Sequence, residues 1–156
     1  MIDFASFQKY SLFGGFSYDD IERIRPLIRI DAYSAGDFII RENESNETIY
    51  FLLEGDVRIS RDSVTIIDMS AGDCFGEMEI LDVMPAAASV RALDPVTVAA
   101  IDNQALHRMY GLDPRLFALF MMNLARDLSR LLRRMDERFC EKVRVARCGE
   151  DLPAAV

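Results

Sequence analysis

One stretch of the chain gathers residue types that suit the binding of an anion. Gly76 lets the backbone turn sharply into a short helix, whose free N–H groups would face an anion. Ala87 and Ala88 are small enough for a bound group to approach their backbone N–H groups, and Ser89 adds a hydroxyl. The segment from residue 75 to residue 90 is therefore the first candidate for a binding site.

The sequence carries little that could act as a catalyst. His107 is the only histidine, and the metal site of a small β-barrel enzyme needs several imidazoles. Cys74, Cys140 and Cys148 are unevenly spaced, which indicates ordinary reduced thiols rather than disulfides or a zinc site. No nucleophile elbow or Walker loop is present. We therefore predict a protein that is not an enzyme and that holds no metal ion or cofactor.

The motifs around the candidate segment resemble, in order, those of the cyclic-nucleotide-binding domain family found in catabolite activators and protein kinase A regulatory subunits. Residues 75–81 and 85–90 resemble its phosphate-binding cassette, in which Phe-Gly-Glu is followed after a gap by Pro-Arg-Ala-Ala-Ser/Thr-Val. Residues 35–57 resemble its first strands and turns, and the segment after residue 103 resembles its hinge and C-helix. The ligand-binding residues that the resemblance implies are Phe75, Gly76, Glu77, Met78, Ala86, Ala87, Ala88 and Ser89. The implied ligand is cyclic AMP or cyclic GMP.

One position departs from the cassette of the family's phosphate-binding members. Ala86 stands where they carry arginine, and the charged hydrogen bond that is lost is typically worth about 1.5–3 kcal/mol. Between residues 62 and 107 the only lysine or arginine is Arg91, among eight acidic residues. Glu79 adds negative charge where the family usually has a small residue, although an acid also suits the start of a short helix. The resemblance implies that Glu77 accepts a hydrogen bond from a ribose hydroxyl. The alternative is that Glu77 only caps the short helix, in a domain that binds no nucleotide.

Helices and strands must position this segment. Ser17 and Asp20 predict the start of a helix that ends or kinks at Pro26. Short β-prone runs follow at residues 38–40, 49–53, 56–60, 64–67, 89–92 and 96–101. Such regularly spaced runs favour a sandwich or barrel. Together with the resemblance they predict a fold that is mainly β with α: an eight-stranded jelly-roll β-barrel, flanked by N-terminal helices and a long C-terminal helix.

The long helix is predicted to begin at Pro114, with Asp113 as its cap, and to reach about residue 145. Its length of roughly 45 Å exceeds the diameter of a small domain, so part of it must lie against a partner or project. We expect a barrel unit at 1–113, this helix at 114–145 and a flexible tail at 146–156. Apolar residues with a strict 3.5-residue period predict a homodimer seam, comprising Phe117, Met121, Leu124, Leu128, Leu131 and Met135. The alternative is a helix that lies wholly on its own domain.

Composition and net charge restrict the partners and the cellular location that we expect for the protein. The net charge is −8, and the first 114 residues carry 20 acidic and 9 basic side chains, which disfavours direct binding to nucleic acid. No apolar run approaches the ~20 residues of a membrane span. The N-terminus does not resemble a secretory signal, so we expect a cytoplasmic protein.

Three functions remain open. The first is a dimeric regulatory module that binds cyclic nucleotides weakly or not at all, and that acts as a scaffold for an unknown protein partner or senses another ligand. The second is a working receptor for cyclic AMP or cyclic GMP that relies on backbone N–H groups, Glu77 or Arg91. The third is the sensing part of a transcription regulator, which would lack its helix-turn-helix because only 17 residues follow Phe139.

Overall fold

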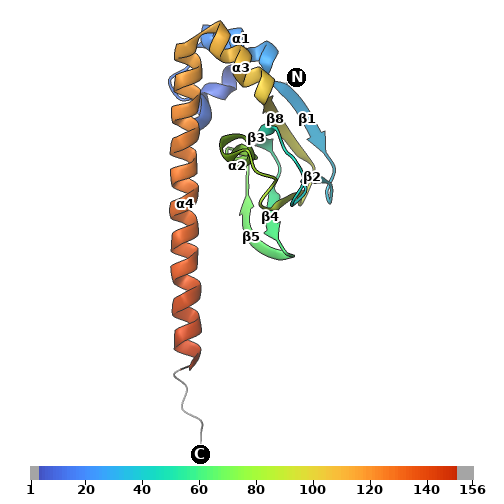
Figure 1. Cartoon of the computed structure of the whole chain (residues 1–156), viewed down its shortest axis with the longest axis vertical. Coiled ribbons are helices and arrows are strands. Elements are labelled where there is room, and N and C mark those ends of the chain that lie inside the picture. The colour runs from blue at the N-terminus through green and yellow to red at the C-terminus, as the bar shows by residue number, and fades with distance from the viewer. Residues whose placement is uncertain (1–3, 151–156) are drawn as a thin grey trace, which may run out of the picture.

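The structure, a computed structural model, describes residues 4–150. Its first elements are helical and lie at one end of the barrel (Figure 1). They are 3-10 helices at Phe4–Lys9, Ser11–Phe13 and Arg25–Leu27, and α1 at Tyr18–Ile24. Ser17 and Asp20 form a reciprocal cap: the Ser17 Oγ accepts the Asp20 N–H at 3.1 Å, and the Asp20 carboxylate accepts the Ser17 N–H at 2.9 Å. The predicted start of this helix is confirmed, and α1 ends just before Pro26 as expected.

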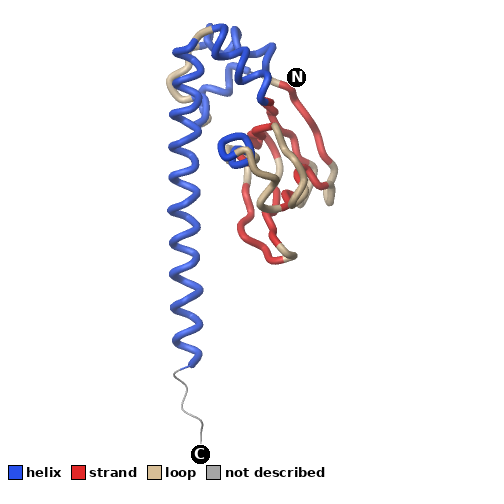
Figure 2. Tube along the Cα trace, in the orientation of Figure 1, coloured by secondary structure: helices blue, strands red, loops and turns tan. Residues whose placement is uncertain are grey.

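Eight antiparallel strands form two four-stranded sheets (Figure 2). The first sheet has the order β1-β8-β3-β6, and its strands span Arg29–Tyr33, Val96–Asp102, Thr48–Glu54 and Cys74–Phe75. The second has the order β2-β7-β4-β5, and its strands span Phe38–Ile40, Ser89–Ala92, Val57–Arg61 and Val64–Met69. The predicted eight-stranded jelly-roll barrel is confirmed. The six runs named from the sequence all became strands, whereas β1 and β6 were not singled out.

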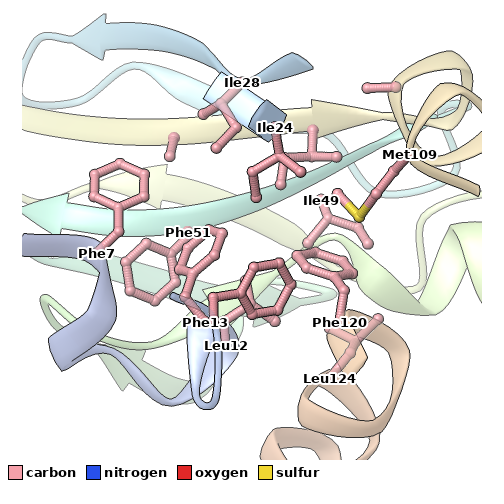
Figure 3. Packing of buried hydrophobic residues seen from close by; sticks show 14 of the residues in the cluster. Phe7, Leu12, Phe13, Ile24, Ile28, Ile49, Phe51, Met109, Phe120 and Leu124 are labelled. Carbon is pink, nitrogen blue, oxygen red and sulfur yellow. The ribbon is translucent and has the colours of Figure 1, made fainter. Parts of the chain in front are cut away.

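Two apolar clusters hold the structure together. The first lies where the helical segments meet one end of the barrel, and aromatic rings fill it (Figure 3). The Phe13 ring lies 5.9 Å from that of Phe51 on β3 and 6.2 Å from that of Phe120 on the last helix. The second cluster fills the barrel interior with side chains such as Leu52, Val57 and Val98. Because both clusters draw on distant parts of the chain, the helices and the barrel share one folded unit.

The C-terminal region consists of α3, at Asn103–Leu112, and α4, at Pro114–Glu150. The Asp113 carboxylate accepts the Arg115 N–H at 3.0 Å, so this residue caps α4 as predicted. The 37 residues of α4 make a rod about 55 Å long, which runs past the far end of the barrel (Figure 1). The helix ends at Glu150 rather than near residue 145, and the rest of the predicted tail lies outside the described residues.

Among the described residues, no helix is both long and apolar enough to cross a membrane. Cys74 is buried and Cys140 is exposed, and both are free thiols. The side chain of Cys148 lies outside the described set.

Candidate functional site

The candidate segment begins with a tight turn from β6 into α2, at Glu77–Asp82. Gly76 makes this turn with a φ of +81°, and an added Cβ would lie 2.5 Å from the carbonyl oxygen of Thr48. Asn46 ties the turn to β3, since its Nδ2 donates to the carbonyl oxygens of Thr48 at 2.9 Å and of Gly76 at 3.2 Å. Only glycine fits here, because both the positive φ and the close backbone exclude a side chain.

The second half of the segment is held by the loop that follows β2. The Ala86 N–H donates to the Glu44 carbonyl oxygen at 2.9 Å, and the Ala86 carbonyl oxygen accepts the Asn43 N–H at 2.8 Å. Asn43 adopts a positive φ of 65°, which asparagine tolerates better than most residues. Ala86 is only 1% exposed and packs in the barrel core. The position that lacks the arginine is therefore a packed core position whose main chain is already fully bonded.

A cavity of about 250 Å³ lies between α2, the barrel and α4. Its walls are mostly apolar and draw on five strands, with Ile40, Ile59, Ile67, Phe75 and Val90 among the residues. From α4, Leu131 and Met135 close one side. This cavity has the size and apolar lining of a small-molecule site with a few polar groups in its wall.

Six of the eight predicted ligand-binding residues line this cavity, namely Phe75, Gly76, Glu77, Met78, Ala87 and Ala88. The other two do not. Ala86 is turned into the core, and the Ser89 Oγ accepts the backbone N–H of Glu42 at 2.9 Å. Arg61, Leu131 and Met135 were not predicted to line it, because they come from distant segments and no local motif marks them.

Two acids dominate the polar part of the cavity wall. Glu77 is 3% exposed, and Glu79 lies one helical residue beyond Met78 on the same short helix. The Oε2 atom of each is out of contact with water and has no hydrogen-bond partner among the described residues. Burial raises the pKa of Glu77 to about 7, with a further contribution from the nearby negative charges of Glu79 and Asp127.

The cations are placed less centrally. Arg91 does not line the cavity: its Nε donates to the Gly36 carbonyl oxygen at 2.8 Å, and its guanidinium lies over the Phe38 ring. Among the described residues, Arg61 is the only cation in the lining; its side chain is 62% exposed and lies 3.8 Å from Glu42. Contacts with Gly36 and Phe38 thus hold Arg91 away from the cavity.

A second cavity of about 240 Å³ lies between the barrel and the preceding turns of α4, and Glu77 belongs to its wall as well. Ion pairs cross or flank it. Arg134 on α4 donates to Asp73 at 2.9 Å, and Arg130 donates to Asp127 on the same helix at 2.7 Å. The Glu77 carboxyl therefore stands between an apolar cavity and a charged one.

The predicted dimer seam on α4 faces this chain's own barrel over much of its length. Leu124 is 1% exposed and belongs to the first core cluster, so it has no surface left for a partner. Phe117 and Met121 pack on the same cluster, and Leu131 and Met135 cover the apolar cavity. The structure thus places Leu124 in this chain's own core and not, as predicted, in a partner interface. A 3.5-residue period indicates an apolar stripe, but it does not indicate which molecule covers that stripe.

A second apolar stripe lies one residue further round α4 and is open to solvent. We call it the outer stripe; its members are Ala118, Met122, Ala125, Leu132 and Phe139. Their spacing follows the same heptad frame, with Ser129 and Asp136 in the two intervening places. Leu132 is 61% exposed and Phe139 is 70% exposed, so this stripe retains surface that a partner can cover.

Comparisons with known proteins agree with this geometry. Residues 30–112 match the family model described as the cyclic nucleotide-binding domain. A cAMP-dependent protein kinase regulatory subunit from Debaryomyces hansenii is 32% identical over 96 residues, which is 61% of this chain and 21% of that protein. The chain thus spans about a fifth of the length of such curated relatives.

Solved structures share the fold over most of the chain. A cyclic nucleotide-binding domain from Methylobacillus flagellatus superposes with a TM-score of 0.82 at 25% identity, covering 89% of this chain and 81% of that one. Thermus thermophilus catabolite activator protein gives a TM-score of 0.70 at 23% identity, covering 85% and 63% respectively. With the barrel, the turn at Gly76 and the helix-covered cavity in their expected order, this chain belongs to the cyclic nucleotide-binding domain family.

Proposed function

We propose that this chain is a non-enzymatic regulatory module that dimerises through α4 and binds cyclic AMP or cyclic GMP weakly or not at all. The observation that carries the proposal is the charge of the cavity wall. Glu77 and Glu79 lie in it with unpaired oxygens, and Ala86 supplies no cation. A cyclic phosphate would bring a further negative charge close to these acids. The repulsion would make the free energy of binding less favourable.

Dimerisation is argued from the outer stripe and from the length of α4. Apolar residues in a heptad frame on an exposed helix favour a second helix of the same kind. The stripe lies on a helix that extends beyond the barrel (Figure 1), so a partner helix has room to lie along it. A regulatory role follows from membership of the family and from the position of Leu131 and Met135, which join the cavity to this helix.

The test is calorimetric titration of the protein with cyclic AMP and with cyclic GMP. We expect no measurable heat of binding at nucleotide concentrations in the low micromolar range. A dissociation constant in the micromolar range or tighter for either nucleotide would contradict the proposal.

One observation favours a second candidate, a working cyclic-nucleotide receptor. Arg61 lines the cavity and is held only loosely by Glu42, so its guanidinium is free to meet a phosphate. If cyclic AMP does bind, Arg61→Gln should weaken it about tenfold or more. Arg58→Gln is the matched control, because Arg58 lies on the same strand but pairs with Asp68 at 2.8 Å and does not line the cavity. Equal effects of the two variants would remove this candidate.

A further inference from the structure

One carboxylate oxygen of each acid in the apolar cavity lacks a hydrogen-bond partner among the described residues. Glu77 is only 3% exposed to solvent, and its Oε2 accepts no hydrogen bond from any described residue. The Oε2 of Glu79, two residues along the same helix, is in the same state. Leaving a buried acceptor unpaired costs free energy. Something that donates hydrogen bonds to these atoms would recover that cost.

The groups packed around Glu77 do not supply such a donor. They come from several elements, and the charged or titratable ones are Arg61, Asp73, Cys74, Glu79, Asp127, Arg130 and Arg134. Each arginine in this set already has another carboxylate: Arg134 has Asp73, Arg130 has Asp127 and Arg61 has Glu42. The set holds three acids and three arginines, but the charges that act on the Glu77 carboxyl are those of Glu79 and Asp127, both negative, so a positive group is favoured beside it.

The rest of the wall selects the body of the ligand. Side chains from β2, β4, β5 and β7 give an almost continuous apolar lining, and Phe75, Leu131 and Met135 complete it. A volume of about 250 Å³ accommodates a compact apolar body such as an aryl-alkyl chain. A small hydrated metal ion would leave this surface unfilled.

We propose that the cavity binds an organic cation, with an ammonium or amidinium head whose N–H groups donate to Glu77 and Glu79 and an apolar body that lies against the barrel strands. This inference rests on the proposed function, in which the same cavity is the sensory site. Charge-assisted hydrogen bonds to two carboxylates give the head its strength, and the apolar wall gives the body its affinity. An anionic ligand of the same shape meets repulsion instead.

The test uses three probes that share one body: 3-phenylpropylamine, 3-phenylpropanol and 3-phenylpropanoate. Calorimetric titration at pH 8 should rank the ammonium probe about ten- to hundredfold tighter than the alcohol, with the carboxylate weakest. For the ammonium probe, affinity should rise about tenfold between pH 6 and pH 8, because the Glu77 carboxyl loses its proton across this range while the amine keeps its own. The affinity of the alcohol should stay constant.

Two variants and a control locate the head. Glu77→Gln and Glu79→Gln should each cut ammonium affinity about tenfold or more, and Glu77→Gln should also remove the pH dependence. Glu54→Gln, on an exposed glutamate at the end of β3, should leave the affinity unchanged. Thermal melts establish that each variant is folded; if Glu77→Gln is not, Glu79→Gln and the wild-type pH profile decide.

The outcomes separate this inference from the proposed function. Equal affinity for the three probes, or tighter binding of the carboxylate, overturns the inference while weak cyclic AMP binding still supports the proposed function. Tight cyclic AMP binding overturns the proposed function, whether or not the ammonium probe binds.

Discussion

At the scale of single residues, the binding properties of the site depend on which side chains are packed in the core and which have atoms left to bind a ligand. Ala86 is enclosed by the barrel core and has both backbone groups bonded to the Asn43–Glu44 turn. Glu77, by contrast, is buried with an oxygen to spare. The same short segment therefore holds Ala86, which is packed and fully hydrogen-bonded, and Glu77, which has an oxygen without a hydrogen-bond partner.

We expect Ala86→Arg to improve cyclic AMP affinity about tenfold, because a guanidinium would supply the missing charged hydrogen bond. The substitution should also lower the melting temperature, since a long side chain must leave a core position that is 1% exposed. Calorimetry and thermal melts measure the two effects. Ala86→Met is the control: it adds similar bulk without charge, so stability should fall while affinity stays low. A similar gain in affinity from methionine would show that charge is not what the site lacks.

The Glu77 carboxyl should make stability depend on pH. Its pKa in the folded protein is about 7, above the ordinary value of 4.5, so the folded state holds the proton more tightly. Its contribution is therefore fully present below pH 4.5 and is lost as the pH rises through 7. The full loss amounts to roughly 3 kcal/mol at most. Between pH 5 and pH 8, denaturant titrations should show wild type losing more stability than Glu77→Gln. Parallel losses in the two proteins would contradict the assignment.

At the scale of elements, the short helix α2 depends on the turn that starts it. Gly76→Ala should destabilise the fold by about 2 kcal/mol or more, because the new Cβ would stand 2.5 Å from a β3 carbonyl oxygen at a positive φ. Gly72→Ala is the matched control: its φ is also positive, at +100°, but nothing lies within 4 Å of the added Cβ. That variant should lose only about 1 kcal/mol, from backbone strain alone. Chemical denaturation compares them, and equal losses would mean that the close contact is relieved by a small shift.

The sequence predicted most of these elements, and the failures have physical reasons. The bounds of β2 and β7 were predicted to the residue, because compact β-prone runs mark strands. β1 escaped notice because Arg29 and Asp31 interrupt its apolar pattern, and its pairing with β8 is what makes it a strand. β6 has only two residues and exists through its register with β3. Tertiary pairing, which no local pattern encodes, created both.

The site was predictable in its local part and not in its long-range part. The turn at Gly76 and the acid after it are adjacent in sequence, so one motif reveals both. Arg61 reaches the cavity from β4, and Leu131 reaches it from α4 some fifty residues beyond the motif. The heptad period of α4 predicted a homodimer seam, but a helix that packs on its own barrel and a helix that packs on a partner share that period. Only the packed structure distinguishes them.

At the scale of the whole molecule, α4 presents two apolar stripes to two different surroundings. The residues of the predicted seam, from Phe117 to Met135, pack on the barrel and cover the cavity. The outer stripe faces solvent. We expect a dimer whose interface lies on the outer stripe. Leu132→Glu together with Phe139→Glu should yield monomers in sedimentation at micromolar concentration, because two charges would enter an apolar interface.

The control for this experiment is Arg133→Glu. It places a carboxylate on an exposed position one residue along from Leu132, about 100° around the helix, and should leave the dimer intact. A wild-type protein that sediments as a monomer would contradict the interface, as would dissociation by the control alone.

Three methionines lie in three different walls of the apolar cavity: Met69 on β5, Met78 on α2 and Met135 on α4. Met78 and Met135 are partly exposed, whereas Met69 is enclosed. Peroxide converts an accessible thioether to a polar sulfoxide, so mild oxidation would change two of the walls and spare the third. The lining would then hold apolar bodies less well while the barrel core stayed intact. The cavity's affinity for such bodies is consequently tied to the redox state of its surroundings.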